Sequence, residues 1–492
     1  MPTPPVDPHL PAVHLRPPRN WINDPNGLVF HDGHYHVFFQ HNPYAPLHAN
    51  VHWGHFRSPD LITWEQLPAA LAPTPGGDDA DGCFSGSAIP VDGRLVAFYS
   101  AHRTDRWWQP VTTAESCDGG HTWVKRPELL IPRPPAGTTM YRDPYVWRQD
   151  GRWRMLVGSA LADGRGAALL YESHDLEDWR YRGPFHSSGA PAGEDPVGWE
   201  CPQYATFGDG RGVLIVSDWT PQGGPSHTTV HVGREEDGRF TATEPPVRLD
   251  HGPDFYAPAL LRAPEEGRWL LWGWAWEARD DSWAHEAGWA GTLTLPRELT
   301  LADDGTVGQR PARELLALRG ERAVHRSGNA TGSGPVELGE VSRSFDLTAT
   351  LTADPHGATG LRLVTSADGA EYLDITFDAA TGRLTVDRGH ASLDVRARAG
   401  TYSLPCPGAK GPGAAVQLRV VVDRSIAEIH LATGQVLTLR FYPVGDGPWR
   451  LQARSMGPGP GGFTVEAWDL NPGRIHREPL PAGQGQDVMA GR

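Results

Sequence analysis

Cysteine is scarce in this chain, with 4 thiols in 492 residues. Their spacing fits neither a metal-binding motif nor the dense framework of a disulfide-stabilised domain, so we expect reduced thiols. No cluster of histidine and cysteine ligands accompanies the acidic motifs described below, and we therefore expect no metal and no other cofactor. The four positions are Cys83, Cys117, Cys201 and Cys406.

Long hydrophobic runs are also missing. Nowhere do about eighteen apolar residues follow one another, the length that a membrane-spanning helix requires. The segment before Trp21 lacks a basic stretch followed by an apolar one, so it does not have the pattern of a secretory signal. We expect a cytoplasmic protein with no membrane partner, or a secreted one if a signal peptide has been removed.

Basic residues are too few for a polyanionic partner. Lys and Arg together number 44 against 59 Asp and Glu, which gives a formal net charge of −15. Nucleic acids and anionic membranes are both bound through basic surface, so the composition argues against either partner. A neutral or small substrate is expected, and nothing in the composition specifies an oligomeric state.

What the chain does contain is an internal repeat. An acidic residue and a glycine precede a short apolar run five times, at successive separations of 60, 58, 59 and 57 residues. Asp-Gly favours a type I′ hairpin, because both central positions of that turn need positive φ. Each repeat is therefore expected to begin with a β-hairpin. The five dipeptides are Asp32-Gly33, Asp92-Gly93, Asp150-Gly151, Asp209-Gly210 and Glu266-Gly267.

A second marker trails the first in four of the repeats. It is an aromatic residue at the start of a strand after a turn, at Trp64, Trp123, Trp179 and Phe240. Repeating units of this length that hold four short strands are typical of propeller blades. The sequence predicts an all-β protein whose residues 1–318 form a five-bladed β-propeller.

The repeat stops after Leu315. Residues 319–340 are rich in Gly, Ser and charged side chains, and we interpret them as a linker. From residue 341 short alternating strands with turn signals follow one another, as in Ser344 to Leu351 and Val416 to Val422, and this spacing predicts a C-terminal β-sandwich over residues 341–475. Residues 476–492 are expected to form a loosely ordered tail.

Polar residues precede the hairpins at one place in the repeat. They lie at separations of 61, 58, 57 and 54 residues. The corresponding place in each blade is the innermost strand, whose end faces the central channel, so these residues should converge on one axial pocket. Three or four carboxylates would then share a small volume. The positions are Asp24, Ser85, Asp143, Glu200 and Asp254.

Each acidic motif has a purely structural interpretation when it is taken alone. Asp24 could close an Asx-turn, Asp143 could pair locally with Arg142, and Glu200 beside Trp199 could be a surface residue. Their shared phase favours chemistry instead. Two neighbouring carboxylates raise the pKa of one of them, which provides an acid and a nucleophile in one site, and glycoside hydrolysis uses such a pair.

Six motifs in this order resemble glycoside hydrolase family 32, the invertases, inulinases and levanases. They are Trp21 to Gly27 (WINDPNG), Phe84 to Ser87, Arg142 to Pro144, Trp199 to Pro202, Asp254 to Ala257 and Leu295 to Leu299. Val421 to Ser425 also resembles a motif of the family's C-terminal sandwich. The resemblance implies a five-bladed propeller followed by a β-sandwich. It further implies hydrolysis of terminal β-D-fructofuranosyl bonds in sucrose, fructo-oligosaccharides or fructans, with retention and a covalent fructosyl-enzyme.

The resemblance also assigns roles. It implies Asp24 as nucleophile, Glu200 as general acid and base, and Asp143 as stabiliser of the transition state, with Arg142 holding fructose hydroxyls. Many members carry Trp where this chain has His48, so the apolar wall of the pocket would need another side chain. The full set of expected substrate-binding residues is Asn23, Asn26, Gln40, Trp53, Phe84, Ser85, Arg142, Tyr256 and Trp274.

Two other functions remain open. A fructosyltransferase uses the same covalent intermediate and differs only in whether water or a sugar accepts the fructosyl group. A catalytically silent fructan-binding propeller is disfavoured, because all three carboxylates are present. The motifs do not distinguish sucrose from inulin or levan, nor attack at chain ends from attack within the chain, since the loops at the channel mouth decide those preferences.

Overall fold

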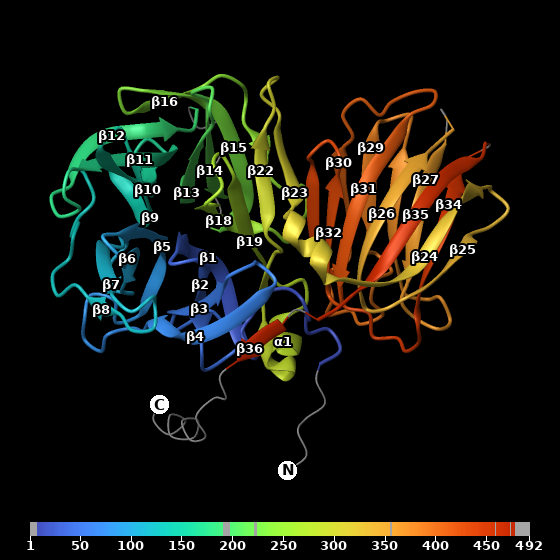
Figure 1. The fold of residues 1–492 in the computed structure, drawn as a ribbon, viewed down its shortest axis with the longest axis horizontal. Helices are drawn as coiled ribbons and strands as arrows, with labels where there is room; N and C mark the ends of the chain where they lie inside the picture. Colours follow the sequence, from blue (N-terminus) through green and yellow to red (C-terminus); the bar gives the residue numbers. More distant parts are fainter. Residues whose placement is uncertain are drawn as a thin grey trace, which may run out of the picture.

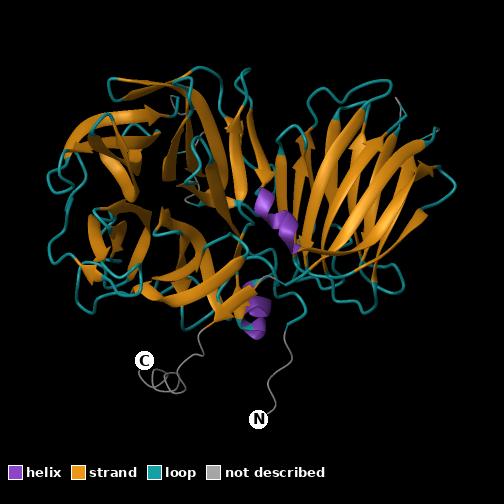
Figure 2. Ribbon diagram, in the orientation of Figure 1, coloured by secondary structure: helices purple, strands orange, loops and turns teal. Residues whose placement is uncertain are grey.

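The computed structural model describes residues 7–189, 197–220, 224–354, 357–457, 459–472 and 474–477. Its chain forms two β-domains side by side, an N-terminal propeller and a C-terminal sandwich (Figure 1). Within those residues, helix is confined to α1 (Asp281–Ala287) and a 3-10 turn (Arg313–Leu318), and strands make up both domains (Figure 2). The predicted all-β class, with a five-bladed propeller followed by a β-sandwich, is confirmed.

Five sheets, counted over the described ranges, form the blades, and the strands named next pair antiparallel within each blade. Blade 1 contains β1 (Asn20–His31), β2 (His34–Asn42), β3 (His52–Ser58) and β4 (Thr63–Leu71), and blade 2 contains β5 (Gly82–Val91), β6 (Arg94–His102), β7 (Val111–Ser116) and β8 (Val124–Lys125). Blade 3 contains β9 (Thr138–Gln149), β10 (Arg152–Leu161), β11 (Gly166–Ser173) and β12 (Arg180–Ser187). Blade 4 contains β13 (Gly198–Thr206), β14 (Gly212–Trp219), β15 (Pro225–Glu236), β16 (Arg239–Ala242) and the short β17 (Val247–Arg248). Blade 5 contains β18 (Tyr256–Arg262), β19 (Trp269–Ala275), β21 (Thr292–Leu293), β22 (Arg297–Leu301) and β23 (Val307–Pro311).

The predicted hairpin turns hold in the first three blades. Asp32, Asp92 and Asp150 have φ of 47°, 48° and 50°, and the glycine after each also has positive φ, as a type I′ turn requires. In blades 4 and 5 the expectation of the same turn is wrong. There only the glycine has positive φ, because the dipeptide lies inside a wider loop, closed in blade 4 by a hydrogen bond from Phe207 N to Arg211 O.

The aromatic markers fix the turn before the outermost strand. The indole N–H groups of Trp64, Trp123 and Trp179 donate to the carbonyl three residues earlier, at 3.1, 3.0 and 2.9 Å. The indole satisfies a turn carbonyl while its ring packs against the blade. In these three blades the repeated aromatic therefore marks the geometry of the blade.

Apolar cores lie between neighbouring blades. One of them joins the last blade to the first, with Phe39 of β2 and Trp272 of β19 both fully buried in it. The short strand β20 (Trp289–Ala290) adds to this closure by pairing in parallel with the start of β1. The ring is thus closed both by side-chain packing and by backbone hydrogen bonds.

The sandwich has two sheets of six strands each within the described chain. One has the order β24 (Arg319–Ala330), β35 (Gly461–Leu470), β26 (Ser344–Thr352), β31 (Ala415–Asp423), β32 (Ile426–Leu431), β33 (Val436–Arg440). The other has the order β25 (Val336–Val341), β34 (Trp449–Met456), β27 (Ala358–Val364), β28 (Tyr372–Asp378), β29 (Arg383–Asp387), β30 (Thr401–Pro405).

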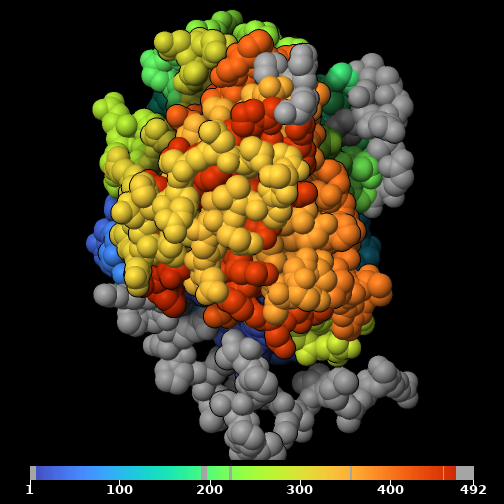
Figure 3. Space-filling view, turned by 90° about the vertical axis from the view of Figure 1, so that its right-hand side faces the viewer, coloured from blue at the N-terminus to red at the C-terminus, as the bar shows by residue number. Residues whose placement is uncertain are grey.

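The expected linker over residues 319–340 is therefore wrong. This segment forms the edge strands β24 and β25 of the two sheets and crosses the outer face of the sandwich, yellow to gold in Figure 3. Most side chains of β24 are exposed. An edge strand with its side chains in water lacks the apolar alternation that identifies a strand from sequence.

The C-terminal boundary also differs from the expected one. Strand β36 (Arg474–Arg477) leaves the sandwich and pairs in parallel with β4, so the chain returns to blade 1 and completes its outer edge (Figure 1). The tail expected from residue 476 overlaps the end of this strand, and residues 478–492 lie outside the described part of the chain.

The two domains meet through buried ion pairs. Asp423 accepts the backbone N–H groups of Ala12 and Val13, and the His14 ring lies between Asp423 and Glu428, at 2.9 and 3.0 Å. Arg297 of blade 5 extends the network, since it pairs with Glu428 of the sandwich. The motifs around Arg297 and Asp423 thus hold the domains together.

Candidate active site

The innermost strands of the blades carry β-bulges near the channel. In blades 3, 4 and 5 the bulged residue has positive φ, 65° at Asp143, 47° at Cys201 and 45° at Ala257, and each is followed by proline. Proline cannot donate to a strand ladder, so it is compatible with an interruption at this point. A bulge turns the local side chains out of the sheet register, here into the channel.

These bulges correct the phase expected from the sequence. Cys201, one residue after Glu200, is the structural equivalent of Asp143, and Glu200 is therefore equivalent to Arg142. Asp254 lies before the bulge of blade 5 and is fully buried against the sandwich, where it pairs with Arg388. The pocket accordingly holds three carboxylates and not four.

Asp24, from β1, is oriented by a relay of polar side chains. Its Oδ2 accepts the Ser85 hydroxyl at 2.6 Å, and its Oδ1 accepts the Asn23 amide at 3.2 Å. The buried Gln40 joins both supports, accepting from Asn23 at 2.9 Å and donating to Ser85 at 2.5 Å. Four expected site residues are thus brought together, with Asp24 partly exposed at the end of the relay.

Asp143, from β9, lies beside Cys201. Its Oδ2 accepts the backbone N–H of Cys201 at 3.0 Å and is 3.6 Å from the thiol, which is itself 3.7 Å from Asp24 Oδ2. The backbone N–H of Asp143 donates to Ser100 Oγ at 2.7 Å. Cys201 and Ser100 escaped the sequence analysis, although the regular spacing of Cys201 from Asp143 was a signal that could have found it.

Glu200, from β13, is held by two donors on opposite sides. Arg142 Nη1 lies 2.9 Å from Oε1, and the Tyr256 hydroxyl donates to Oε2 at 2.9 Å. The same hydroxyl is 3.2 Å from the carbonyl oxygen of Asp218. Blades 3, 4 and 5 therefore converge on this one carboxylate.

Burial controls the protonation of the three acids. It raises the pKa of Asp24 to about 6, opposed by the Ser85 hydroxyl and reinforced by the charge of Glu200. Burial likewise raises the pKa of Asp143 to about 6 and that of Glu200 to about 7, in both cases opposed by Arg142. Because the acids repel one another when ionised, the cluster favours a mixture of charged and protonated carboxyls near neutral pH.

Aromatic rings line the channel around the acids. The His48 ring meets Trp21 and Phe84 edge-on, with centroids 6.0 and 5.5 Å apart, and Trp274 lies 5.7 Å from Trp21. His48 thus takes part in an aromatic wall made mainly by other rings. Two of the expected substrate-binding residues, Phe84 and Trp274, belong to this group of rings.

Two expected substrate-binding residues lie elsewhere. Trp53 is fully buried in the core between blades 1 and 2, where its indole N–H donates to the Phe84 carbonyl at 3.1 Å. Asn26 is also fully buried in β1. Neither side chain is open to a ligand, because both are fully enclosed by the surrounding protein.

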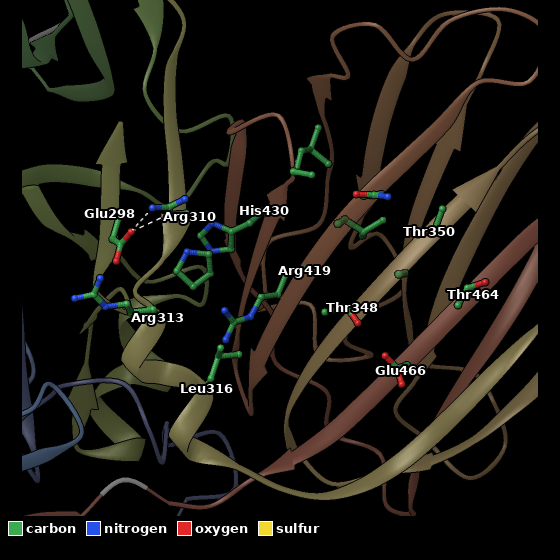
Figure 4. Close-up of a pocket in the computed structure, with 16 residues that line it drawn as sticks. Glu298, Arg310, Arg313, Leu316, Thr348, Thr350, Arg419, His430, Thr464 and Glu466 are labelled. Atoms are coloured by element: carbon green, nitrogen blue, oxygen red, sulfur yellow. Dashed lines mark hydrogen bonds and ion pairs between the residues drawn. The ribbon is translucent and has the colours of Figure 1, made fainter. Parts of the chain in front are cut away.

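A separate cleft of about 620 Å³ lies between blade 5 and the sandwich. Glu298, Arg310 and Arg313 line its propeller side, and Arg419 and Glu466 line its sandwich side (Figure 4). None of the expected site residues lies in it. The clustered acids of the channel are therefore the candidate reaction centre.

Among the described residues, no group of three or more His, Cys, Asp or Glu side chains is placed to hold a metal ion. None of the helices in the same ranges is long and apolar enough to cross a membrane.

Comparisons with known proteins agree with this geometry. The sequence model described as the glycosyl hydrolases family 32 N-terminal domain matches residues 14–311, and the one described as glycosyl hydrolases family 32 C terminal matches residues 314–457. The second match begins at the 3-10 turn before β24, which fits the assignment of β24 and β25 to the sandwich.

Individual relatives cover most of the chain. A sucrose-6-phosphate hydrolase of Zymomonas mobilis is 33% identical over 464 residues, which cover 88% of this chain and 87% of the relative. A raffinose invertase of Escherichia coli is 34% identical over 457 residues, covering 89% and 90%. The solved structure of a sucrose-6-phosphate hydrolase from Lactobacillus gasseri has a TM-score of 0.79 at 26% identity and covers 95% of this chain and 94% of its own.

The fold, the site and the relatives agree on one chemistry. The protein is a fructosidase, a hydrolase whose substrate is a fructoside. The chain belongs to glycosyl hydrolase family 32.

Proposed function

We propose that Asp24 is the nucleophile, Glu200 the general acid and base, and Asp143 the stabiliser of the transition state in a retaining fructosidase. One observation carries the assignment. Three carboxylates from three blades meet in the channel, each with different hydrogen-bond partners. Because their surroundings differ, the acid and the nucleophile have different pKa values. A double-displacement reaction needs this difference, since one carboxyl must be protonated while the other is ionised.

In the first step Asp24 attacks the anomeric carbon while Glu200 gives its proton to the departing oxygen. The raised pKa of Glu200, about 7, keeps that proton available near neutral pH. In the second step the Glu200 carboxylate takes a proton from water, which displaces Asp24 from the opposite face. Two inversions give net retention.

Arg142 and Asp143 complete the proposal as residues that grip the fructosyl ring. Arg142 has one guanidinium nitrogen on Glu200, and its guanidinium carries further N–H donors. Hydrogen bonds that the ring hydroxyls donate to a carboxylate strengthen as the ring flattens toward an oxocarbenium ion. We therefore expect Asp143→Asn to lower kcat by roughly a hundredfold and KM much less.

For the substrate we propose sucrose or a sucrose extended on its glucose side. This proposal draws its support from the relatives, which are named as a sucrose-6-phosphate hydrolase and a raffinose invertase. The test is a comparison of kcat/KM for sucrose, sucrose 6-phosphate, raffinose and inulin. Inulin as the best of the four would contradict the proposal.

Stereochemistry tests the mechanism. Hydrolysis in dilute methanol should give methyl β-fructofuranoside, which NMR identifies and which cannot mutarotate as free fructose does. The α-anomer would show a single displacement and remove Asp24 as the nucleophile.

Variants test the two roles separately. Asp24→Asn should lose about four orders of magnitude in kcat on every fructoside. Glu200→Gln should lose as much on sucrose but keep most of its rate of fructosyl-enzyme formation from an aryl fructoside, whose leaving group needs no proton. A Glu200→Gln variant with parental activity on sucrose would remove Glu200 from the mechanism.

A further inference from the structure

Tyr256 depends on another aromatic ring for its position. The Tyr256 and Trp276 rings stack with centroids 5.5 Å apart and an angle of 17°. The indole N–H of Trp276 donates to the Pro253 carbonyl at 2.8 Å and lies 3.3 Å from Asp254 Oδ1. Tyr256, the donor to Glu200, is thus tied to the segment that carries Asp254.

Asp254 is in turn held from the other domain. Its Oδ2 accepts the backbone N–H of Arg440 at 2.8 Å and pairs with the Arg388 guanidinium. Arg440 ends β33 and Arg388 follows β29, so both belong to the sandwich. Arg388 is itself fixed by the Tyr402 hydroxyl at 2.9 Å. The charged partners that Asp254 has in these contacts therefore come from the sandwich.

We propose that the sandwich positions the general acid, with Arg388 and Asp254 acting as positioning residues through Trp276 and Tyr256. The chain of contacts runs without a break from Arg388 to the Glu200 carboxylate. The sandwich contributes no residue to the three-carboxylate cluster, yet by this path it fixes the hydroxyl that holds one of them. The proposal rests on the role of Glu200 as acid and base proposed above.

The expected signature is a change in the pH dependence of the rate. The groups that face Glu200 are Arg142, Asp143, Asp24, Cys201 and Tyr256. Of these, Tyr256 is the one that the contacts above connect to the sandwich. Its hydroxyl favours the ionised carboxylate, so displacing it should raise the pKa of Glu200 and move the alkaline limb of kcat/KM upward by about one pH unit. We expect kcat to fall about tenfold and KM to change less.

Asp254→Asn and Arg388→Gln are the principal variants. Arg388→Lys keeps the cation and should restore most of the parental profile. Trp276→Phe keeps the stacked ring but removes the indole N–H, and it tests the path if the buried variants fold poorly. Glu428→Gln is the matched control, because Glu428 is equally buried at the same interface but contacts Arg297 and His14 instead.

A double-mutant cycle decides whether the path runs through Tyr256. Tyr256→Phe alone should shift the alkaline limb as Asp254→Asn does, and the double variant should shift it no further. Additive shifts would contradict the proposal. A second result would also contradict the proposal. In it, Asp254→Asn would lose as much stability and kcat as Glu428→Gln, and the alkaline limb of its pH profile would not move.

The same measurements separate this proposal from the one on which it rests. The parental protein should show the alkaline limb of kcat/KM on sucrose but not on an aryl fructoside, whose leaving group needs no proton. A limb that persists on the aryl fructoside overturns the acid assignment itself. A limb that is confined to sucrose but does not move in Asp254→Asn overturns only the positioning role of the sandwich.

Discussion

At the scale of single residues, the site depends on the protonation states of Asp24, Asp143 and Glu200, which the residues around each acid control. Burial raises the pKa of each, and the hydrogen-bond donors around each acid lower it again. Asp24 must be ionised to attack, and Glu200 must be protonated to release the leaving group. As pH falls through about 6 Asp24 takes up a proton, and as it rises through about 7 Glu200 loses one, so kcat/KM should be bell-shaped between these values.

Cys201 offers a prediction on the acid limb of that profile. Its thiol lies near both Asp24 and Asp143 and helps to lower the pKa of each. Cys201→Ala should therefore raise the acid limb of kcat/KM by about half a pH unit, the size suited to a weak S–H donor, and Cys201→Ser should restore it. The measurement is the pH profile of the three proteins on sucrose. An acid limb equal in all three would show that the thiol has no part in the titration.

At the scale of elements, the blades depend on strands that lie far away in sequence. Strand β36 is the last described segment of the chain, yet it completes the edge of the first blade beside β4. Such a strand contributes backbone hydrogen bonds and covers an edge that would otherwise be open to pairing with other molecules. It lies at the outer edge of the blade, whereas the reacting acids lie on the innermost strands.

Removing β36 should therefore cost stability and leave catalysis intact. A chain ended after Pro472 should lose about 1–3 kcal/mol in free energy of unfolding, as expected for a few backbone hydrogen bonds, with kcat unchanged. A chain ended after Arg477 keeps the strand and is the control. Urea denaturation and sucrose assays of both would check the prediction, and equal stability of the two chains would count against it.

At the scale of the whole molecule, buried charges join the propeller to the sandwich. His14 lies between Asp423 and Glu428, whose charges and hydrogen bonds raise its pKa against the effect of burial. The pKa values of both carboxyls are lowered, chiefly by His14 for Asp423 and by Arg297 for Glu428, which overcome the effect of burial. This network is fully charged only where the histidine is protonated and both acids are ionised.

The sign of the pH effect follows from these shifts. A raised histidine pKa stabilises the fold below the unfolded value of about 6.5, and that contribution is lost as pH rises through the folded value. We expect the free energy of unfolding to fall from pH 6 to 8. His14→Gln should lower stability by about 3 kcal/mol at pH 6 and flatten this slope.

The control for this prediction is His325→Gln. His325 also faces a carboxylate, Glu466, but its side chain is 61% exposed, so its removal should change little. Urea denaturation at each pH gives the comparison. A His14→Gln protein that keeps the parental slope would show that another group is responsible for it.

The sequence by itself determined the repeat and the chemistry that it carries. Asp-Gly turns and outer-strand tryptophans form their contacts with residues only a few positions away in the chain. Their pattern can therefore be recognised from the sequence without a structure. Because Asp24, Asp143 and Glu200 recur at nearly one phase, their convergence on the axis could be predicted without a structure. The departure of a single residue in the phase of Glu200 left one trace in the sequence, the regular spacing of Cys201 from Asp143, but its cause is the bulges that appear when the strands pair.

Only the tertiary structure decided which segments and side chains each strand contacts. Trp53 and Asp254 carry the residue types of a sugar site, but one fills the core between blades and the other meets the sandwich. Residues 319–340 have a linker's composition and become edge strands because β34 and β35 supply their hydrogen bonds. Long-range packing and pairing choose between such outcomes, and local residue preferences contain no information about the partner.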